Sequence, residues 1–472
     1  MATNPNGSSG KMEIVVFPWL AMGHLIPFLH FSKLLAQNGH NIHFVSTPKN
    51  LSRLPKLPLR LSSQITFVPF PLPPVPNLPP DAESSMDVPY NNQQLLKKAF
   101  DSLRPPLTDF LRQLKPDWVI YDYASHWLPS AAADAGGGGI GCAFFSLFTA
   151  TTLCFVGPPG GDSRRNAEDF TVVPDWIPIE IKSNIAYRLH EVSKYVEKTD
   201  EDTSGPSDQI RFAVAMEESN ALLVRSSREF EPEWFELLGQ MYKEKTIIPV
   251  GFLPPPIAAN DKEDQNDAVW REIRDWLDKQ RVNTVVYVAL GTEAALTRDE
   301  IAELASGLEK SALPFFWALR DHSVSGRMML PGGFEERVKG RGIVYREWVP
   351  QVRILSHDSV GGFLTHCGYN SVVEGLAFGR VLILFPVIND QGLNARLLEG
   401  KKLGIEIPRE EKDGSFTSDA VAETVKAAVV GESGEGWRRA VKGAKGLFGG
   451  REKNGEMVDA LVRYLTENKR NG

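Results

Sequence analysis

Polar side chains that could bind a nucleotide gather between residues 348 and 391. In FLTHCGYNSVVEGLAFG, a strand-like run leads through a turn into a helix-like run, and Asn370 and Ser371 stand where a helix cap is expected. Free backbone N–H groups and the helix dipole favour an anion there, and His366 before the turn can donate a hydrogen bond to it. Glu374, about one turn further on, can accept two hydroxyl hydrogen bonds, as a ribose would offer.

The two ends of the same stretch add an aromatic ring and an acid–amide pair. Trp348 offers a flat face on which a base can stack, and Asp390 and Gln391 follow the strand-like VLILFP, where they could bind several hydroxyls of one sugar. Taken singly, each residue has an ordinary structural explanation, such as a helix cap, core packing, a solvated charge or a turn. Only the whole set in a fixed order favours a binding site.

A candidate base lies near the start of the chain. His24 follows the first strand-like run, in the loop MGHL, and an imidazole with an unperturbed pKa near 6.5 suits removal of a proton from a hydroxyl group. Taken alone, His24 would more often be an ordinary histidine at a helix start, and Asp122 in VIYDYAS an ordinary strand-end cap.

Composition bounds the class of protein. The 472 residues favour two to four domains, and the 52 Lys and Arg against 59 Asp and Glu argue against a broad nucleic-acid face. No apolar run is long enough to cross a membrane, and Pro18 and His24 interrupt the first one, so a signal peptide is not expected. Three cysteines without metal-ligand or disulfide spacing agree with a cytoplasmic protein.

Strand-like and helix-like runs alternate through both halves of the chain, which predicts an α/β protein built from βαβ units with parallel sheets. The expected organisation is an N-terminal domain at 1–250, a linker at 251–273, a C-terminal domain at 274–455 and a final helix at 456–472, which packs back on the N-terminal domain. The glycine run AGGGGIG at 135–141 is read as a helix end and loop, because no GxGxxG frame leads into a helix there.

The stretch from Trp348 to Gln391 resembles the signature box of plant family 1 UDP-sugar glycosyltransferases. It has the same length as the family's box, 44 residues with both ends counted, and matches it at WVPQ, at the Leu and His of LSH, at HCGxNS, at Glu374 and at the closing DQ. The resemblance covers essentially the whole chain, including FPWLAMGHLIPFL, FVSTP and VALGT. It is nearest to a plant branch whose members often glycosylate flavonoid or terpenoid glycosides.

The resemblance implies a GT-B fold, with two Rossmann-like domains facing across a cleft, and a UDP-sugar donor as co-substrate with no cofactor and no metal. It implies His24 as the base that takes the acceptor proton and Asp122 as the carboxylate that orients it. The UDP-sugar site carried over by motif consists of Thr149, Thr292, Trp348, Val349, Gln351, His366, Gly368, Tyr369, Asn370, Ser371, Glu374, Asp390 and Gln391.

Two positions depart from the family pattern. Tyr369 stands where the box usually has Trp beside the sugar, which leaves the donor open between UDP-glucose, favoured by the terminal Gln391, and UDP-rhamnose. Arg380-Val381 stands where Gly-Val-Pro is usual, and little effect is expected from it.

The function expected from these residues is inverting, metal-independent transfer of a sugar to a hydroxyl of a small plant product, such as a flavonoid or terpenoid, glycosylated or not. The expected partners are the donor and a small-molecule acceptor, with no nucleic acid, no membrane span and a monomeric chain. A non-catalytic sugar-nucleotide-binding protein is a rival, against which His24, Asp122 and Asp390-Gln391 argue. A dinucleotide oxidoreductase is a weaker one, because FPWLAMGH replaces a GxGxxG motif after the first strand.

Overall fold

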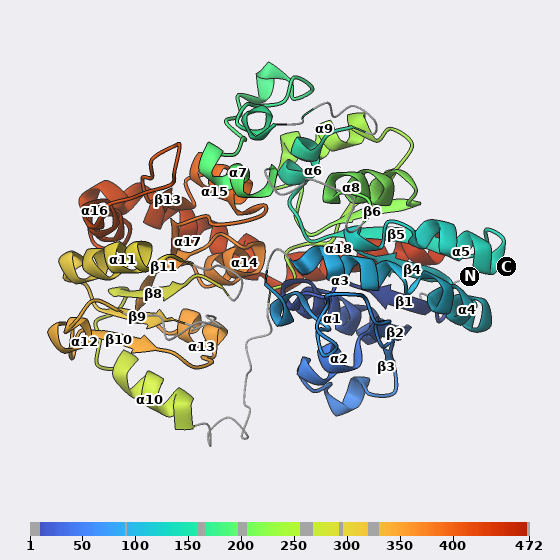
Figure 1. The fold of residues 1–472 in the computed structure, drawn as a ribbon, viewed down its shortest axis with the longest axis horizontal. Coiled ribbons are helices and arrows are strands. Elements are labelled where there is room, and N and C mark those ends of the chain that lie inside the picture. The colour runs from blue at the N-terminus through green and yellow to red at the C-terminus, as the bar shows by residue number, and fades with distance from the viewer. Residues whose placement is uncertain are drawn as a thin grey trace, which may run out of the picture. The chain divides into compact units, whose positions relative to one another are not determined.

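The computed structural model describes residues 10–89, 92–158, 164, 166–196, 205–254, 268–291, 296–319 and 330–469. The chain divides into two compact units, shown in Figure 1 and described separately below. Unit 1 comprises 1–163, 198–253 and 451–472, and unit 2 comprises 164–197 and 254–450. Each of these units therefore contains chain from both sides of the 251–273 linker expected from the sequence.

Unit 1 is built on a parallel sheet in the order β3-β2-β1-β4-β5-β6-β7. Its strands are β1 (Glu13–Phe17), β2 (Asn41–Ser46), β3 (Ile65–Pro69), β4 (Trp118–Tyr121), β5 (Gly141–Ser146), β6 (Ala221–Val224) and β7 (Thr246–Pro249). Its helices are α1 (Met22–Gln37), α2 (Pro48–Arg53), α3 (Gln93–Asp101), α4 (Arg104–Leu114), α5 (Leu128–Gly136), α6 (Ala150–Val156), α8 (Asp208–Glu217), α9 (Pro232–Met241) and α18 (Arg451–Glu467).

The core of unit 1 joins the first helix to the last. Apolar side chains of α1, the sheet and α18 form one buried cluster, in which Phe28, Phe145 and Leu461 are fully buried. The indole N–H of Trp118 donates to the carbonyl of Leu465 at 3.0 Å, which ties α18 to β4. Each such apolar side chain contributes about 1.5–3 kcal/mol on burial. The C-terminal helix is therefore part of the unit that positions His24.

Unit 2 contains a second parallel sheet, in the order β10-β9-β8-β11-β12-β13. Its strands are β8 (Val285–Ala289), β9 (Phe315–Ala318), β10 (Gly342–Tyr345), β11 (Val360–Thr365), β12 (Val381–Leu384) and β13 (Gly404–Glu406). Its helices are α7 (Leu189–Val196), α10 (Ala268–Leu277), α11 (Arg298–Ser311), α12 (Phe334–Arg337), α13 (Gln351–Ser356), α14 (Tyr369–Ala377), α15 (Gln391–Gly400), α16 (Ser418–Val429) and α17 (Glu435–Gly449).

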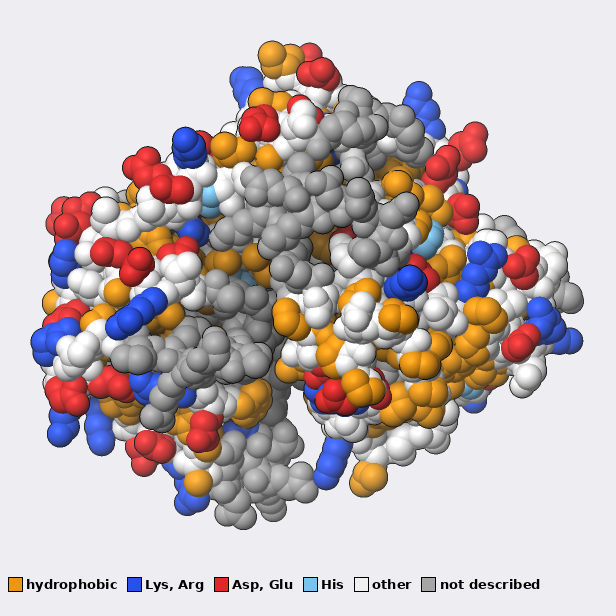
Figure 2. All heavy atoms as spheres, in the orientation of Figure 1, with side chains coloured by type: hydrophobic (Ala, Val, Ile, Leu, Met, Phe, Trp, Pro, Cys, Tyr) orange, Lys and Arg blue, Asp and Glu red, His pale blue; other side chains and the backbone are white. Residues whose placement is uncertain are grey.

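The α/β class with parallel sheets is confirmed, and so is the glycine run as a helix end: α5 stops at Gly136, and Gly137 takes the left-handed conformation with φ +56°. Residues 93–114 form two helices, α3 and α4, and not one, because Pro105 and Pro106 fit the first turn of a new helix better than the middle of a continuous one. No helix in the described ranges is long and apolar enough to cross a membrane. Lys, Arg, Asp and Glu side chains are interspersed over the described atoms of the face in Figure 2.

Candidate functional site

His24 and Asp122 meet because β1 and β4 are neighbours in the sheet of unit 1. Phe17 at the end of β1 is paired with Tyr121 at the end of β4, so the residues that follow both strands emerge at the same edge. His24 lies in the first turn of α1, and its Nδ1 is 2.6 Å from Oδ2 of Asp122. The imidazole is 18% exposed and the carboxylate 1%. The pairing predicted from the motif is thus present as a hydrogen bond.

Backbone donors hold the Asp122 carboxylate in place. Oδ2 also accepts from the backbone N–H of Trp19 at 3.1 Å, and Oδ1 accepts from that of Tyr123 at 2.8 Å. An ionised carboxylate can only accept hydrogen bonds. Nδ1 of His24 therefore carries the proton of the neutral ring, and Nε2 is the basic nitrogen.

Aromatic rings surround the imidazole, and sequence reasoning missed them. The rings of Tyr123 and Phe148 each lie 6.0 Å from the His24 ring, and Phe212 stacks on Tyr123 at 4.5 Å. The three rings come from the turn after β4, the loop after β5 and helix α8, so no local periodicity links them. They make the surroundings of the base apolar and aromatic, which suits an aromatic or polycyclic acceptor.

Two ion pairs join helix α8 to α3, and a hydrogen bond joins it to the turn after β4. Arg211, which is fully buried, donates to Asp101 at 2.6 and 2.8 Å and to the carbonyl of Ala124 at 2.9 Å. Lys97 pairs with Asp208 at 2.5 Å. The buried side chain of Arg211 therefore fixes both α8 and the turn that follows Asp122.

His126 and Thr149 have structural partners within unit 1. Nδ1 of His126 is 3.2 Å from Nη1 of Arg211, and burial and then the Arg211 charge lower the pKa of His126. Thr149 caps α6: its Oγ1 accepts from the backbone N–H of Thr152 at 3.1 Å, and the residue is 1% exposed. That Thr149 contacts the transferred sugar stays a prediction.

In unit 2, His366 follows β11 and packs against two glycines. A Cβ at Gly291 would lie 2.8 Å from its Nε2, and a Cβ at Gly368 would lie 2.5 Å from the same atom, so neither position tolerates a side chain. Burial lowers the pKa of His366 to about 4, so the ring is neutral at pH 7. Its Nδ1 has no hydrogen-bond partner within the described chain.

Helix α14 begins earlier than the sequence suggested. Its cap is Gly368 and not Asn370 or Ser371, which lie in the first turn. The cap has no side-chain hydrogen bond, because glycine offers none and the His366 ring excludes a larger residue there. The residue at the cap thus supplies no side-chain acceptor to the first turn of α14, and the dipole at a helix start favours an anion.

A hydrogen-bonded group joins α13 to α14. Nε2 of Gln351 donates to Glu374 at 2.7 Å and to Ser371 at 3.2 Å, and its Oε1 accepts from the Tyr287 hydroxyl at 3.2 Å. Next to Gln351, Trp348 is 64% exposed whereas Val349 is buried. The structure therefore brings Gln351, Ser371 and Glu374 together and leaves the indole on the surface of unit 2.

Asp390 and Gln391 lie at the start of α15. Oδ2 of Asp390 accepts from the amide of Asn394 at 2.7 Å, and Asn394 also donates to the carbonyl of Cys367 at 3.1 Å. Gln391 is buried, and its Oε1 accepts from the backbone N–H groups of Val387 and Ile388 at 3.0 and 2.9 Å. The loop between β12 and α15 is thus shaped by the side chain expected to bind the sugar.

Thr292 and Arg380 are the remaining positions that the sequence analysis singled out. Thr292 lies outside the described residues, so its predicted role at the diphosphate stays a prediction. Arg380, one of the departures from the family pattern, is buried and donates to the carbonyls of Leu355, His357 and Val360 at 2.7, 3.1 and 2.5 Å. It thus ties the end of α13 to the start of β11.

Comparisons with known proteins identify the family of the chain. The family described as UDP-glucoronosyl and UDP-glucosyl transferase matches residues 256–434, and the glycosyltransferase N-terminal domain matches residues 10–143. The chain is 59% identical to UDP-glycosyltransferase 91C1 of Arabidopsis thaliana over 96% of each chain. It is 38% identical to soyasaponin III rhamnosyltransferase of Glycine max over 98% of each chain. The chain therefore belongs to the plant family 1 UDP-glycosyltransferases and is a transferase that takes a UDP-sugar.

Among solved structures, the fold resembles Arabidopsis thaliana UGT89C1 complexed with UDP-L-rhamnose, with a TM-score of 0.75 and 25% identity over 97% of this chain and 100% of that one. The two parallel-sheet Rossmann-like units are those of the GT-B fold, as the sequence predicted.

Proposed function

We propose that the protein transfers glucose from UDP-glucose to a hydroxyl of a small plant product, with inversion at the anomeric carbon. Nε2 of His24 takes the proton of the acceptor hydroxyl, and the acceptor oxygen forms a bond to the anomeric carbon. The bond from that carbon to the diphosphate oxygen breaks, its electron pair leaves with UDP, and Asp122 stabilises the imidazolium. The short hydrogen bond between His24 and the buried Asp122 carries this proposal.

The groups of unit 2 would hold the donor. Trp348 and Val349 would contact the uracil, Gln351 the nucleoside, and Glu374 the ribose hydroxyls. The diphosphate would bind His366, Gly368, Asn370, Ser371 and Thr292. Neutral His366 would donate one hydrogen bond to it, and the dipole at the start of α14 would stabilise the charge that develops as UDP leaves.

The sugar itself would lie against Asp390, Gln391, Tyr369 and Thr149. An acid and an amide side by side can bind the equatorial hydroxyls of glucose in series, which supports glucose as first choice. UDP-rhamnose is the second candidate, since a relative carries the name soyasaponin III rhamnosyltransferase and UGT89C1 was solved with UDP-L-rhamnose. The site would discriminate between the two donors because the wrong sugar would leave polar groups of the protein without hydrogen-bond partners.

The acceptor class we propose is a flavonoid or terpenoid, including ones that already carry a sugar. The rings of Tyr123, Phe148 and Phe212 near His24 support an apolar acceptor. We further propose that the enzyme is a cytoplasmic monomer that needs no cofactor or metal ion.

The test is release of UDP from a panel of UDP-glucose, UDP-rhamnose, UDP-galactose and UDP-xylose, with and without flavonoid and terpenoid acceptors, and with products identified by mass spectrometry. We expect acceptor-dependent release, fastest with UDP-glucose. A higher kcat/KM with UDP-rhamnose would overturn the donor assignment, and Tyr369→Trp would then be the first variant to test for a return to glucose. Binding without turnover would favour a non-catalytic sugar-nucleotide-binding protein.

A further inference from the structure

One segment from the first half of the sequence belongs to unit 2. The signature box does not predict the contacts that this segment makes there. Residues 164–197 lie between β5 and β6 in the sequence, yet they pack with unit 2. We name Tyr187–Glu191 the strap. It includes the first residues of α7 and lies against the start of α15, the helix that begins with Gln391.

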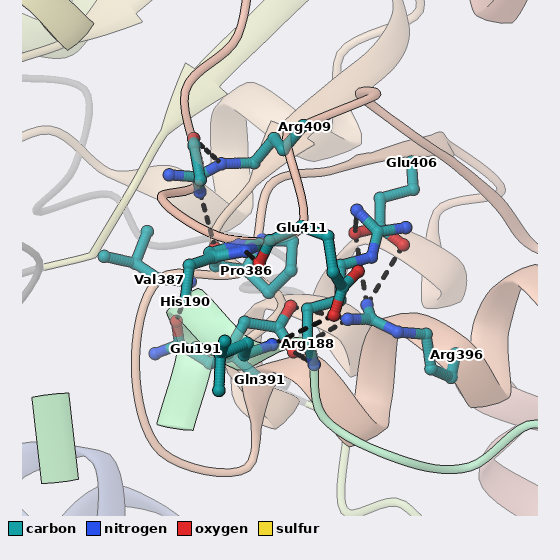
Figure 3. Close-up of polar contacts among 12 residues, drawn as sticks. Arg188, His190, Glu191, Pro386, Val387, Gln391, Arg396, Glu406, Arg409 and Glu411 are labelled. Carbon is teal, nitrogen blue, oxygen red and sulfur yellow. Dashed lines mark hydrogen bonds and ion pairs between the residues drawn. The ribbon is translucent and has the colours of Figure 1, made fainter. Parts of the chain in front are cut away.

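Four buried or half-buried charges attach the strap to the rest of unit 2 (Figure 3). The guanidinium of Arg396 on α15 lies between two carboxylates. It donates to Glu191 of the strap at 2.6 and 2.7 Å and to Glu406 of β13 at 3.1 and 3.0 Å. Arg188 of the strap pairs with Glu406 at 2.9 Å. Arg396, Glu191 and Glu406 are each 6% exposed or less, and the four groups balance as two positive and two negative charges, so removal of one leaves a net charge in buried surroundings.

The strap also meets α15 at the residue after Gln391. A Cβ at Gly392 would lie 2.3 Å from Oε2 of Glu191 and 3.1 Å from Cδ1 of Tyr187, so only glycine leaves room for the strap. The same Glu191 oxygen accepts from the backbone N–H of Arg188 at 2.8 Å, which fixes the carboxylate within the strap. Contact at Gly392 and an ion pair one turn later at Arg396 together hold the first turn of α15.

Further bonds secure the other side of the strap. The backbone N–H of Leu189 donates to Glu411 at 3.0 Å, and Nδ1 of His190 lies 3.2 Å from the carbonyl of Glu411. Arg409, close by in the sequence, donates to the carbonyl of Pro386 at 3.0 Å, at the start of the loop that Gln391 shapes. The strap and the loop before α15 are therefore held by the same segment, 409–411.

We infer that Glu191 and Arg188 are positioning residues for the sugar-binding end of the donor site: through Gly392 and Arg396 they set where Asp390 and Gln391 lie. The inference rests on the proposed function of Asp390 and Gln391. Glu191 does not need to touch the sugar, because a shift of about 1 Å in a positioned group can cost about 100-fold in rate.

The test measures how much the sugar adds to donor binding. Titration calorimetry gives the Kd of UDP and of UDP-glucose, and kinetics give kcat/KM for UDP-glucose. For Glu191→Gln we expect a loss of about 10- to 100-fold in kcat/KM, with the Kd of UDP within about 2-fold of the wild type, because the UDP contacts lie on α13 and α14. The affinity gain from UDP to UDP-glucose should shrink as well. Glu309→Gln is the matched control, since Glu309 forms another two-bond pair, with Arg337 of the same unit.

A double-mutant cycle distinguishes a positioning role of Glu191 from a simple loss of folding stability. Gly392→Ala should impair UDP-glucose use in the wild type, and less so in a Glu191→Ala background, where the colliding carboxylate is gone. The inference is overturned if Glu191→Gln lowers only the melting temperature, if UDP and UDP-glucose lose affinity equally, or if the two substitutions are additive. Should the wild type bind UDP-glucose without transferring it, the proposed function fails, while the binding comparison still decides the role of the strap.

Discussion

The two units prepare their functional groups in different ways. In unit 1, the imidazole of His24 is fixed by a carboxylate 98 residues away, which two backbone N–H groups hold in turn. In unit 2, most of the polar groups come from one stretch of 44 residues and bond to one another, as Gln351 does with Ser371 and Glu374. Gln391 likewise bonds to its own loop.

This contrast teaches where substitutions should be costly. A base that is held by a single buried partner loses its function when either residue of the pair is replaced. A donor site built from several groups that share hydrogen bonds should lose affinity in smaller steps, because each group supplies one part of the contact. The difference predicts the largest effect for the loss of His24 and smaller effects for the loss of Glu374 or Gln391.

Replacement of His24 by Ala should lower turnover by about 100- to 10,000-fold, because the general base is lost. The Kd of UDP should stay near the wild-type value, since the proposed UDP contacts belong to unit 2. His43→Gln is the matched control: His43 pairs with Glu13 at 2.8 Å and is 18% exposed, as His24 is. Wild-type rates for His24→Ala would remove it as the base.

Replacement of Glu374 by Ala should weaken UDP binding by about 10- to 150-fold, because a charge-assisted hydrogen bond is worth about 1.5–3 kcal/mol. The affinity for the acceptor should stay at the wild-type value. Calorimetry with UDP alone measures the effect, and Glu423→Ala, which removes an exposed carboxylate from α16, serves as control. An unchanged Kd for UDP would exclude Glu374 from the site.

Replacement of Gln391 by Ala should slow transfer from UDP-glucose by about 10-fold, while UDP itself binds as before. Part of the loss would come from the loop, because Oε1 of Gln391 accepts from two backbone N–H groups. Gln391→Glu keeps an oxygen for those donors and separates the two contributions. A weaker UDP affinity in the Ala variant would show that the residue acts on the nucleotide end.

The smallest effect concerns pH and compares two histidines. Burial lowers the pKa of His366 in unit 2 and of His30 in unit 1 to about 4 each, from an ordinary 6.5. Between these values the unfolded chain binds more protons than the folded one, so the free energy of unfolding should fall as the pH drops from about 6.5 towards 4. Urea denaturation at pH 7 and pH 5 should show a smaller fall for His366→Gln and for His30→Gln. An unchanged pH dependence in both variants would contradict these pKa shifts.

Sequence reasoning was sufficient where a signal is local. Alternating periodicity predicted the parallel sheets, and the signature box predicted the residues that cluster around Gln351 and Glu374. It misplaced the start of α14, because Gly368 is selected by contact with the His366 ring and not by capping chemistry. The pairing of Glu191 with Arg396 joins residues 205 positions apart in a stretch without clear periodicity, so no pattern could predict it.

The central claim, that His24 removes the acceptor proton, is tested most directly with a series of phenolic acceptors of decreasing pKa. The ratio of kcat/KM between the wild type and His24→Ala should be largest for the least acidic hydroxyl and shrink steadily as the phenol becomes easier to ionise. A ratio that is the same for every acceptor would contradict the claim, because His24 would then be positioning the substrate without taking its proton.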